Sequence, residues 1–281
     1  MTSPAPATAN SALPTIAFIG GGNMASAIIG GLIGQGHPAS QIEVVEPYAP
    51  TREALLKNFG LTAQPEAGPA LQRASIVVWA VKPQTFKDAA AQARAHTPQA
   101  LHLSVAAGIR SDSIAQWLGT ERVVRTMPNT PALVGKGMSA IYARPAVTPA
   151  ERQSVEAIMA STGEFLWVES ETQLDAVTAL SGSGPAYVFY FLEAMTRAGV
   201  GMGLTEAQAH KLAVGTFVGA SELARRSHEP PAVLRERVTS KGGTTYAALQ
   251  SMEASGVSQA FEAAMRAAEK RANELGNEFG A

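Results

Sequence analysis

Glycines at a fixed spacing are the first residues along the chain whose types suggest chemistry. They form part of the segment Ile19-Gly20-Gly21-Gly22-Asn23-Met24-Ala25. In the pattern Gly-x-Gly-x-x-Ala, Gly20 permits a tight turn, Gly22 lets the backbone approach a pyrophosphate, and Ala25 allows a helix to pack closely on a strand. Three glycines could also serve turn geometry alone. The position at the first predicted strand-to-helix turn favours dinucleotide binding.

An acidic residue follows at the end of the next predicted strand. Glu46 closes the run that starts at Ile42, at about the separation from the glycines expected of an acid that holds the adenosine ribose. A carboxylate there disfavours a 2′-phosphate and favours NAD, whereas Arg52 could instead pair with that phosphate. An exposed glutamate before a proline turn is the alternative interpretation.

Three further predicted strands end in loops of unusual composition. In a doubly wound sheet, ligands bind at the carboxyl ends of the strands, so these loops are candidates for the same crevice. Their coincidence at one sheet edge carries the prediction, because each loop taken alone is ordinary turn chemistry. The candidate cofactor contacts are Ala80, Val81, Lys82 and Pro83, then Ala106, Ala107 and Gly108, and finally Asn129.

Two glycine-rich segments interrupt the C-terminal part, which otherwise has helical character. They are Ser181–Tyr187 and Val238–Thr245, and each leads into a predicted helix. Backbone N–H groups together with Ser and Thr hydroxyls at a helix N-terminus suit an anion such as a carboxylate. A capped helix start without a ligand is the alternative for either segment.

Composition excludes several classes of function. The 281 residues carry a net charge of -1, which gives no electrostatic basis for nucleic-acid binding. The chain has no cysteine, which removes disulfides, thiolate nucleophiles and cysteine-ligated metals, and the five histidines show no ligand spacing. We therefore predict no metal. Apolar runs are too short to cross a bilayer, and we expect a cytoplasmic protein.

The order of predicted elements sets the fold class. Short β-branched runs alternate with helix-compatible stretches up to about residue 171, whereas helical periods dominate from residue 172 onward. We predict a flexible tail over 1–13, a Rossmann-type doubly wound α/β domain over 14–171, and an all-α domain over 172–281. The seven predicted strands are 15–19, 42–46, 75–81, 101–105, 123–126, 138–143 and 165–168.

Helix starts and surface composition give two further expectations. Thr148-Pro149-Ala150-Glu151 and Thr205-Glu206-Ala207-Gln208 both read as helix N-termini, the first as a capping box. Charged residues make up 16% of the chain, below the roughly 25% usual for soluble proteins. Some surface is therefore expected to be covered by another subunit.

Taken together, these motifs resemble pyrroline-5-carboxylate reductases. The resemblance runs from Thr15 to about Leu275, and its most specific part is the loop Val238–Thr245, which continues through Ala248-Leu249 to Met252-Glu253. It also includes the glycine turn, Ala80–Pro83, Arg125–Pro131 and Ser181–Tyr187.

The resemblance implies a function and an assembly. Hydride transfer from NADPH or NADH would reduce 1-pyrroline-5-carboxylate to L-proline, the last step of proline synthesis. Helices of the second domain would interleave in a homodimer, and dimers of that family often join into a decamer. The implied substrate residues are Ser240, Gly242, Gly243, Thr244 and Thr245, with Thr245 bonding the ring nitrogen as the catalytic contact.

Two departures from the family concern the cofactor. Many relatives carry Ser, Asn or Arg where this chain has Glu46, and Pro65–Gly68 lacks an Asn that some relatives place against the cofactor. Glu46 leans toward NAD, and both cofactors stay open.

Two other functions compete with the reductase. A β-hydroxy-acid dehydrogenase would need a shuttle lysine on the first long helix of the second domain, and no lysine occurs between Thr172 and Gln208. A non-catalytic dinucleotide-binding regulator would not need the second anion site.

Overall fold

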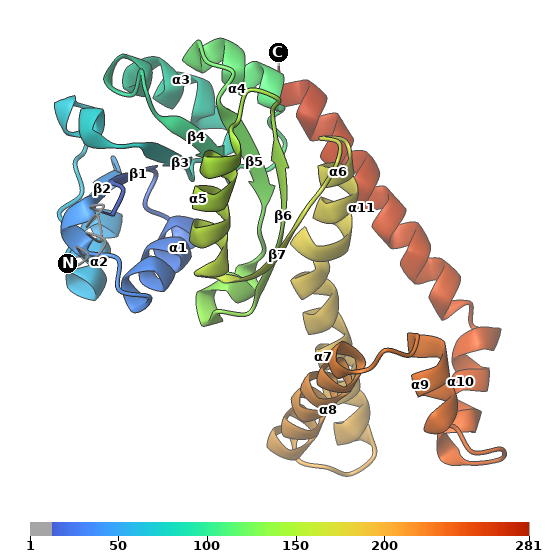
Figure 1. The fold of residues 1–281 in the computed structure, drawn as a ribbon. Coiled ribbons are helices and arrows are strands. Elements are labelled where there is room, and N and C mark those ends of the chain that lie inside the picture. Colours follow the sequence, from blue (N-terminus) through green and yellow to red (C-terminus); the bar gives the residue numbers. More distant parts are fainter. Residues whose placement is uncertain (1–12, 281) are drawn as a thin grey trace, which may run out of the picture. The chain divides into compact units, whose positions relative to one another are not determined.

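The computed structural model describes residues 13–280, so residues 1–12 of the predicted tail lie outside the described part. Contacts divide the chain into two compact units (Figure 1). The first runs to residue 182 and also includes the stretch from residue 269 onward, while the second is 183–268. We describe each unit by itself. The predicted domain boundary at residue 172 stays a prediction, because compactness does not establish independent folding.

A seven-stranded sheet organises the first unit, in the order β2-β1-β3-β4-β5-β6-β7. All neighbouring strands are parallel except β5 and β6, which run antiparallel. Each predicted strand is confirmed with its ends shifted by two residues at most. The strands are β1 Ile16–Ile19, β2 Ile42–Val45, β3 Ile76–Trp79, β4 Leu101–Ser104, β5 Val123–Met127, β6 Gly137–Ala143 and β7 Gly163–Trp167.

Helices cover the sheet and are the other regular elements of the described chain. After Trp167 the described residues contain no strand, and the predicted fold class, an α/β sheet followed by helices, is confirmed. The α-helices are α1 Asn23–Gly34, α2 Ala49–Phe59, α3 Pro83–Ala93, α4 Ser111–Leu118, α5 Pro149–Ala160, α6 Gln173–Val177, α7 Gly184–Gly201, α8 Glu206–Arg226, α9 Pro231–Arg237, α10 Thr244–Ala254 and α11 Val257–Phe279. Short 3₁₀ turns are η1 Ala39–Gln41, η2 Pro69–Arg73, η3 Arg94–His96 and η4 Thr130–Val134, and η5 Thr178–Gly182 is a π-helical turn.

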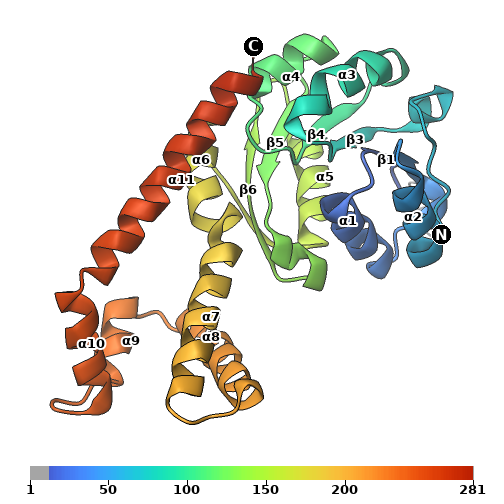
Figure 2. The ribbon, with the colours of Figure 1, turned by 180° about the vertical axis from the view of Figure 1, so that it is seen from behind.

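The sheet separates two hydrophobic cores. Ile16 and Phe18 of β1 point into one core with α1 and α5, whereas Ala17 and Ile19 point into the other with α3 and α4. Successive side chains of a strand lie on opposite faces, so a strand covered on both sides needs an unbroken apolar run. This explains the sequence of β3, and Figure 2 shows helices on both faces of the sheet.

A polar pair lies inside the second of these cores. The Trp79 indole N–H donates to His102 Nδ1 over 3.0 Å, and the Trp79 ring stacks on Phe86 at 4.8 Å between centroids. Burial of His102, reinforced by the positive charge of Arg122, lowers its pKa from 6.5 to about 4. The imidazole is therefore neutral at pH 7, with Nδ1 acting as an acceptor.

The two predicted helix starts are confirmed as capping boxes. Thr148 accepts from the Glu151 N–H, and Thr205 accepts from the Gln208 N–H, with the return contact present in both. In the second unit, Tyr187 and Phe191 of α7 pack edge-on against Phe261 of α11. No helix in the described part of the chain has the length and apolarity needed to cross a membrane.

Candidate functional site

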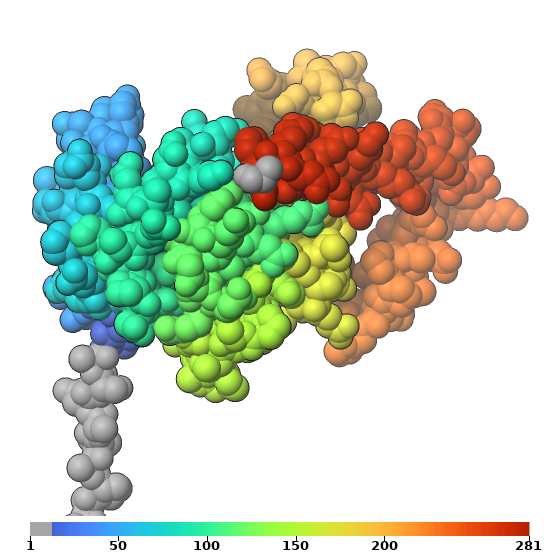
Figure 3. All heavy atoms as spheres, turned by 90° about the horizontal axis from the view of Figure 1, so that it is seen from above, coloured from blue at the N-terminus to red at the C-terminus, as the bar shows by residue number. Residues whose placement is uncertain are grey.

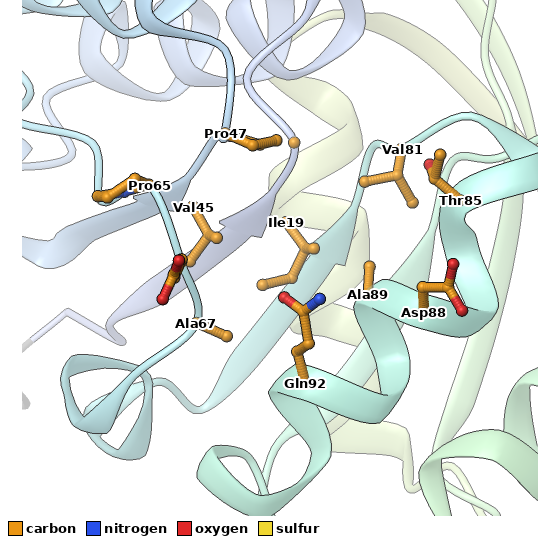
Figure 4. A pocket seen from close by; sticks show the side chains of 12 residues that line it. Ile19, Val45, Pro47, Pro65, Ala67, Val81, Thr85, Asp88, Ala89 and Gln92 are labelled. Atoms are coloured by element: carbon orange, nitrogen blue, oxygen red, sulfur yellow. The ribbon is translucent and has the colours of Figure 1, made fainter.

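A hollow of about 830 Å³ opens at the carboxyl ends of β1, β2 and β3. Strand order reverses between β1 and β3, since the chain first moves to β2 on one side and then to β3 on the other. Ligands of open α/β sheets bind at such a switch point. Figure 4 shows the side chains around the hollow. Its lining is Ile19, Gly20, Val45, Pro47, Pro65, Glu66, Ala67, Val81, Thr85, Asp88, Ala89 and Gln92.

The glycine turn after β1 depends on its glycines for two separate reasons. Gly20 has φ +96°, and a Cβ on it would lie 2.5 Å from the Ala80 carbonyl oxygen, so only glycine fits there. Gly21 is buried, and a Cβ on it would lie 2.7 Å from Leu55 of α2. Around Gly22, by contrast, a Cβ would meet no atom within 4 Å. The backbone at Gly22 is thus accessible to a ligand.

The N-terminus of α1 is electrostatically suited to an anion. Gly22 is its N-cap residue, no side chain caps the helix, and the first turn holds no acidic residue. Uncapped N–H groups and the positive end of the helix dipole stabilise a phosphate. The residues present therefore fit the pyrophosphate of a dinucleotide.

Glu46 lies beside this turn and is fully engaged with backbone groups. Its Oε2 accepts from the Gly21 N–H and its Oε1 accepts from the Tyr48 N–H, and both distances are 2.8 Å. Arg52 donates through Nη1 to the carbonyls of Glu46 and Pro47, at 2.9 and 2.6 Å. The Arg52 guanidinium thus bonds backbone carbonyls and forms no ion pair with the Glu46 carboxylate.

The next loops lie at the same sheet edge. Lys82 is exposed and precedes α3, with Pro83 as the first helical residue, and Val81 lines the hollow. Ala106 is buried beyond the end of β4, and Gly108 adopts φ +71°. The structure therefore places the predicted cofactor residues Ala80–Pro83 and Ala106–Gly108 on neighbouring strand ends.

Asn129 has a different environment. Its Oδ1 accepts from the Met138 N–H over 2.9 Å, and its Nδ2 donates to the Ser181 carbonyl over 3.1 Å. The side chain is buried and ties the end of β5 to the π-helical turn η5. Its role as a cofactor contact stays a prediction.

The predicted substrate loop lies in the second unit. Gly242 has φ +75°, the Gly243 N–H donates to the Ser240 carbonyl over 3.0 Å, and a Cβ on Gly243 would lie 2.6 Å from Ser240 Oγ. Gly243 is the N-cap residue of α10, which has neither a side-chain cap nor an acidic residue in its first turn. Thr244 and Thr245 are exposed in that turn. This segment therefore forms a second uncapped helix start.

One face of α3 was absent from the predicted site. Thr85, Asp88, Ala89 and Gln92 lie along it and line the hollow opposite Pro65 and Ala67 (Figure 4). Their helical spacing after β3 was the available signal. Among the described residues, no group of three or more His, Cys, Asp or Glu side chains could hold a metal ion.

The sheet order, the glycine turn and the helices that follow define a class, the dinucleotide-dependent oxidoreductases with a helical C-terminal part. Residues 15–108 match the model "NADP oxidoreductase coenzyme F420-dependent", and residues 171–275 match "Pyrroline-5-carboxylate reductase dimerisation". The pyrroline-5-carboxylate reductase of Pseudomonas aeruginosa is 45% identical over 95% of this chain and 98% of its own. That of Pisum sativum is 37% identical over 93% and 96%.

Solved structures agree with these relatives. A pyrroline-5-carboxylate reductase from Coxiella burnetii superposes with a TM-score of 0.87 at 35% identity, covering 93% of this chain and 98% of that one. The NADP-bound pyrroline carboxylate reductase of Plasmodium falciparum gives 0.85 at 27% identity, covering 94% and 99%. The chain belongs to the pyrroline-5-carboxylate reductase family.

Proposed function

We propose that this chain reduces 1-pyrroline-5-carboxylate to L-proline with NADH or NADPH, the last step of proline biosynthesis. The observation that carries the proposal is the uncapped glycine turn at the switch point of the sheet, in a chain that matches reductases of this family along nearly its whole length. NAD(P)H supplies the hydride, and the rest of the site needs only to hold substrate and cofactor in order.

The proposed cofactor contacts are the glycine turn Gly20–Ala25, Glu46, the strand-end loops Ala80–Pro83 and Ala106–Gly108, and Asn129. Glu46 supports a preference for NADH over NADPH. Its carboxylate lies against the Gly21 and Tyr48 N–H groups, and a 2′-phosphate approaching the same turn would meet a like charge.

The proposed substrate site is the loop Ser240–Thr245. Backbone N–H groups at the uncapped start of α10 and the hydroxyls of Ser240, Thr244 and Thr245 would bind the substrate carboxylate. We assign Thr245 the hydrogen bond to the ring nitrogen, as the family resemblance implies.

The chemistry is compatible with this set of residues. A protonated C=N carbon is already electrophilic, so hydride addition at carbon needs positioning more than a strong acid or base. The ring nitrogen keeps its proton and becomes the amine of proline. A hydroxyl that fixes the orientation of the ring nitrogen is sufficient for this step.

The proposed assembly is a homodimer through the helical part, with decamers as the higher-order form that the resemblance implies, and the proposed location is the cytoplasm. The family's dimerisation model over residues 171–275 supports self-association. Exposed apolar side chains on α7 and α8 also support it.

Steady-state oxidation of NADH and of NADPH with racemic 1-pyrroline-5-carboxylate tests the reaction. We expect turnover that saturates in the substrate, with the larger kcat/KM for NADH. Binding of either cofactor without turnover would instead support the non-catalytic regulator.

A further inference from the structure

The last turns of α11 pack on the loop between β4 and α4, far from it in sequence. Figure 3 shows the C-terminal segment against atoms of the segment that includes α4, and residues from 269 onward belong to the same compact unit as the sheet. The contacts join residues 108–113 to residues 275–280.

Shape fixes the first of these contacts. Gly108 has the left-handed φ of +71°, and a Cβ on it would lie 2.9 Å from the Leu275 Cβ. The absence of a side chain at Gly108 therefore allows the helix to approach the loop backbone closely. One turn further, Phe279 packs on the core that α3 and α4 share with the sheet.

Hydrogen bonds fix the second part of the contact. Arg110 Nη2 donates to Asn277 Oδ1 over 3.1 Å, and Ser113 Oγ donates to the Gly280 carbonyl over 2.7 Å. Arg110 is the N-cap residue of α4, and its guanidinium lies beside the buried Gly276. The end of α11 is thus bonded to the start of α4 at two points.

The loop is held at its first residue, since Ala106 is buried and its N–H donates to Ser104 Oγ over a distance of 3.3 Å. Ala106, Ala107 and Gly108 have almost no side chain with which to anchor the backbone. Beyond the loop, Glu171 accepts hydrogen bonds from the N–H and the hydroxyl of Ser111, both with a length of 2.6 Å. These bonds fix the start of α4. On the α11 side, Leu275 is the residue nearest the Gly108 backbone, and the Asn277 side chain accepts the hydrogen bond from Arg110.

We propose that Leu275 and Asn277 are positioning residues for the cofactor, which hold the loop Ala106–Gly108 in the conformation that binds it. This inference rests on the proposed function, because it takes that loop as a cofactor contact. It makes the C-terminal end of the chain part of the cofactor site, although none of the sequence motifs for the cofactor lies there.

The test compares cofactor binding in point variants of the full chain. We expect Leu275→Ala/Asn277→Ala to raise the Kd for NADH, measured by fluorescence titration without substrate, at least fivefold. The KM for 1-pyrroline-5-carboxylate at saturating cofactor should change less than twofold. Asn277→Asp keeps an acceptor for Arg110 and should bind NADH like the wild type, whereas Asn277→Ala should not.

Glu269→Ala, at an exposed position of the same helix, is the matched control and should leave the Kd unchanged. If the double variant melts below the assay temperature, the Kd for NADH of Asn277→Ala is compared with that of Asn277→Asp, and a higher Kd for Asn277→Ala alone supports the inference. A Kd within twofold of wild type in folded Ala variants would overturn the inference while leaving the reductase reaction intact. A wild-type chain that binds neither cofactor would remove both.

Discussion

At the residue scale, Glu46 is the side chain that we propose as the determinant of cofactor choice. Both carboxylate oxygens accept backbone N–H groups, one from Gly21 in the glycine turn and one from Tyr48, the N-cap residue of α2. The Glu46 carboxylate already occupies the Gly21 N–H, which a phosphate of the cofactor could otherwise use. In the proposed ribose site, Glu46 would therefore both repel a 2′-phosphate and compete with it for the Gly21 N–H.

Glu46→Ser is expected to shift the ratio of kcat/KM for NADPH over that for NADH by about tenfold or more toward NADPH. Two unit charges about 4 Å apart interact by about 1 kcal/mol in water and by about 4 kcal/mol near a protein surface, and 1.4 kcal/mol corresponds to tenfold. Steady-state kinetics with both cofactors measures the ratio. Glu53→Ser, on the exposed side of α2, is the control. An unchanged ratio would remove Glu46 from the ribose site.

Thr245→Ala is expected to lower kcat roughly 10- to 100-fold, because a hydrogen bond to a charged group is worth about 1.5–3 kcal/mol. The Kd for NADH should stay within twofold, since the residue is assigned to the substrate. Thr245→Ser keeps the hydroxyl and should retain most of the activity. Loss of NADH binding in Thr245→Ala would place the loop with the cofactor instead.

Sequence could predict these residues only in part. The spacing of Gly20, Gly22 and Ala25 predicted the turn, because its mechanism depends on local geometry. That Glu46 bonds the Gly21 N–H, and that Asn129 bonds Ser181, depends on how strand ends meet in space. No local pattern encodes such contacts.

At the element scale, the buried Trp79–His102 pair couples β3 and β4 to pH. Burial holds the His102 pKa at about 4 in the folded protein against 6.5 for the unfolded chain. Between these values the unfolded chain binds more protons. Stability from this group is therefore complete above pH 6.5 and is lost as pH falls toward 4, by about 3 kcal/mol in total.

Denaturant unfolding at pH 7.5 and pH 5.0 measures this effect. Wild type should lose about 2 kcal/mol more of its free energy of unfolding than His102→Gln over that interval, since Gln does not titrate and can still accept from the Trp79 indole. Other titrating groups are common to both chains and cancel in the difference. Equal losses would show that His102 is not the cause.

Elements were the most predictable level of this fold. Unbroken apolar runs such as that of β3 predicted strands covered on both faces, and the capping boxes at Thr148 and Thr205 predicted helix starts. The lining face of α3 and the return of α11 to the sheet unit were not predicted. Both depend on packing between elements, which a periodic pattern along one element does not specify.

At the scale of the whole molecule, the low charged fraction has a counterpart in the structure. Large apolar side chains are exposed on α7 and α8, among them Phe189 at 58% and Leu223 at 68%. Such surfaces mark interaction sites in proteins that fold normally. The helical region carries the family's dimerisation model, which makes a second copy of the chain the expected partner.

Phe189→Glu is expected to weaken self-association at least tenfold, because a charge buried without a partner in an interface is strongly unfavourable. Light scattering after size-exclusion chromatography at several protein concentrations measures the mass. Leu56→Glu on α2, with a similar exposure of 54%, is the matched control. A wild-type chain that remains monomeric at all concentrations would contradict the proposed dimer.

The central claim is that this chain converts 1-pyrroline-5-carboxylate to L-proline with a nicotinamide cofactor. Its most direct test follows NADH oxidation and product formation together, with the product resolved by chiral chromatography. We expect one L-proline formed for each NADH consumed. NADH oxidation without proline, or no oxidation with either NADH or NADPH, would contradict the account.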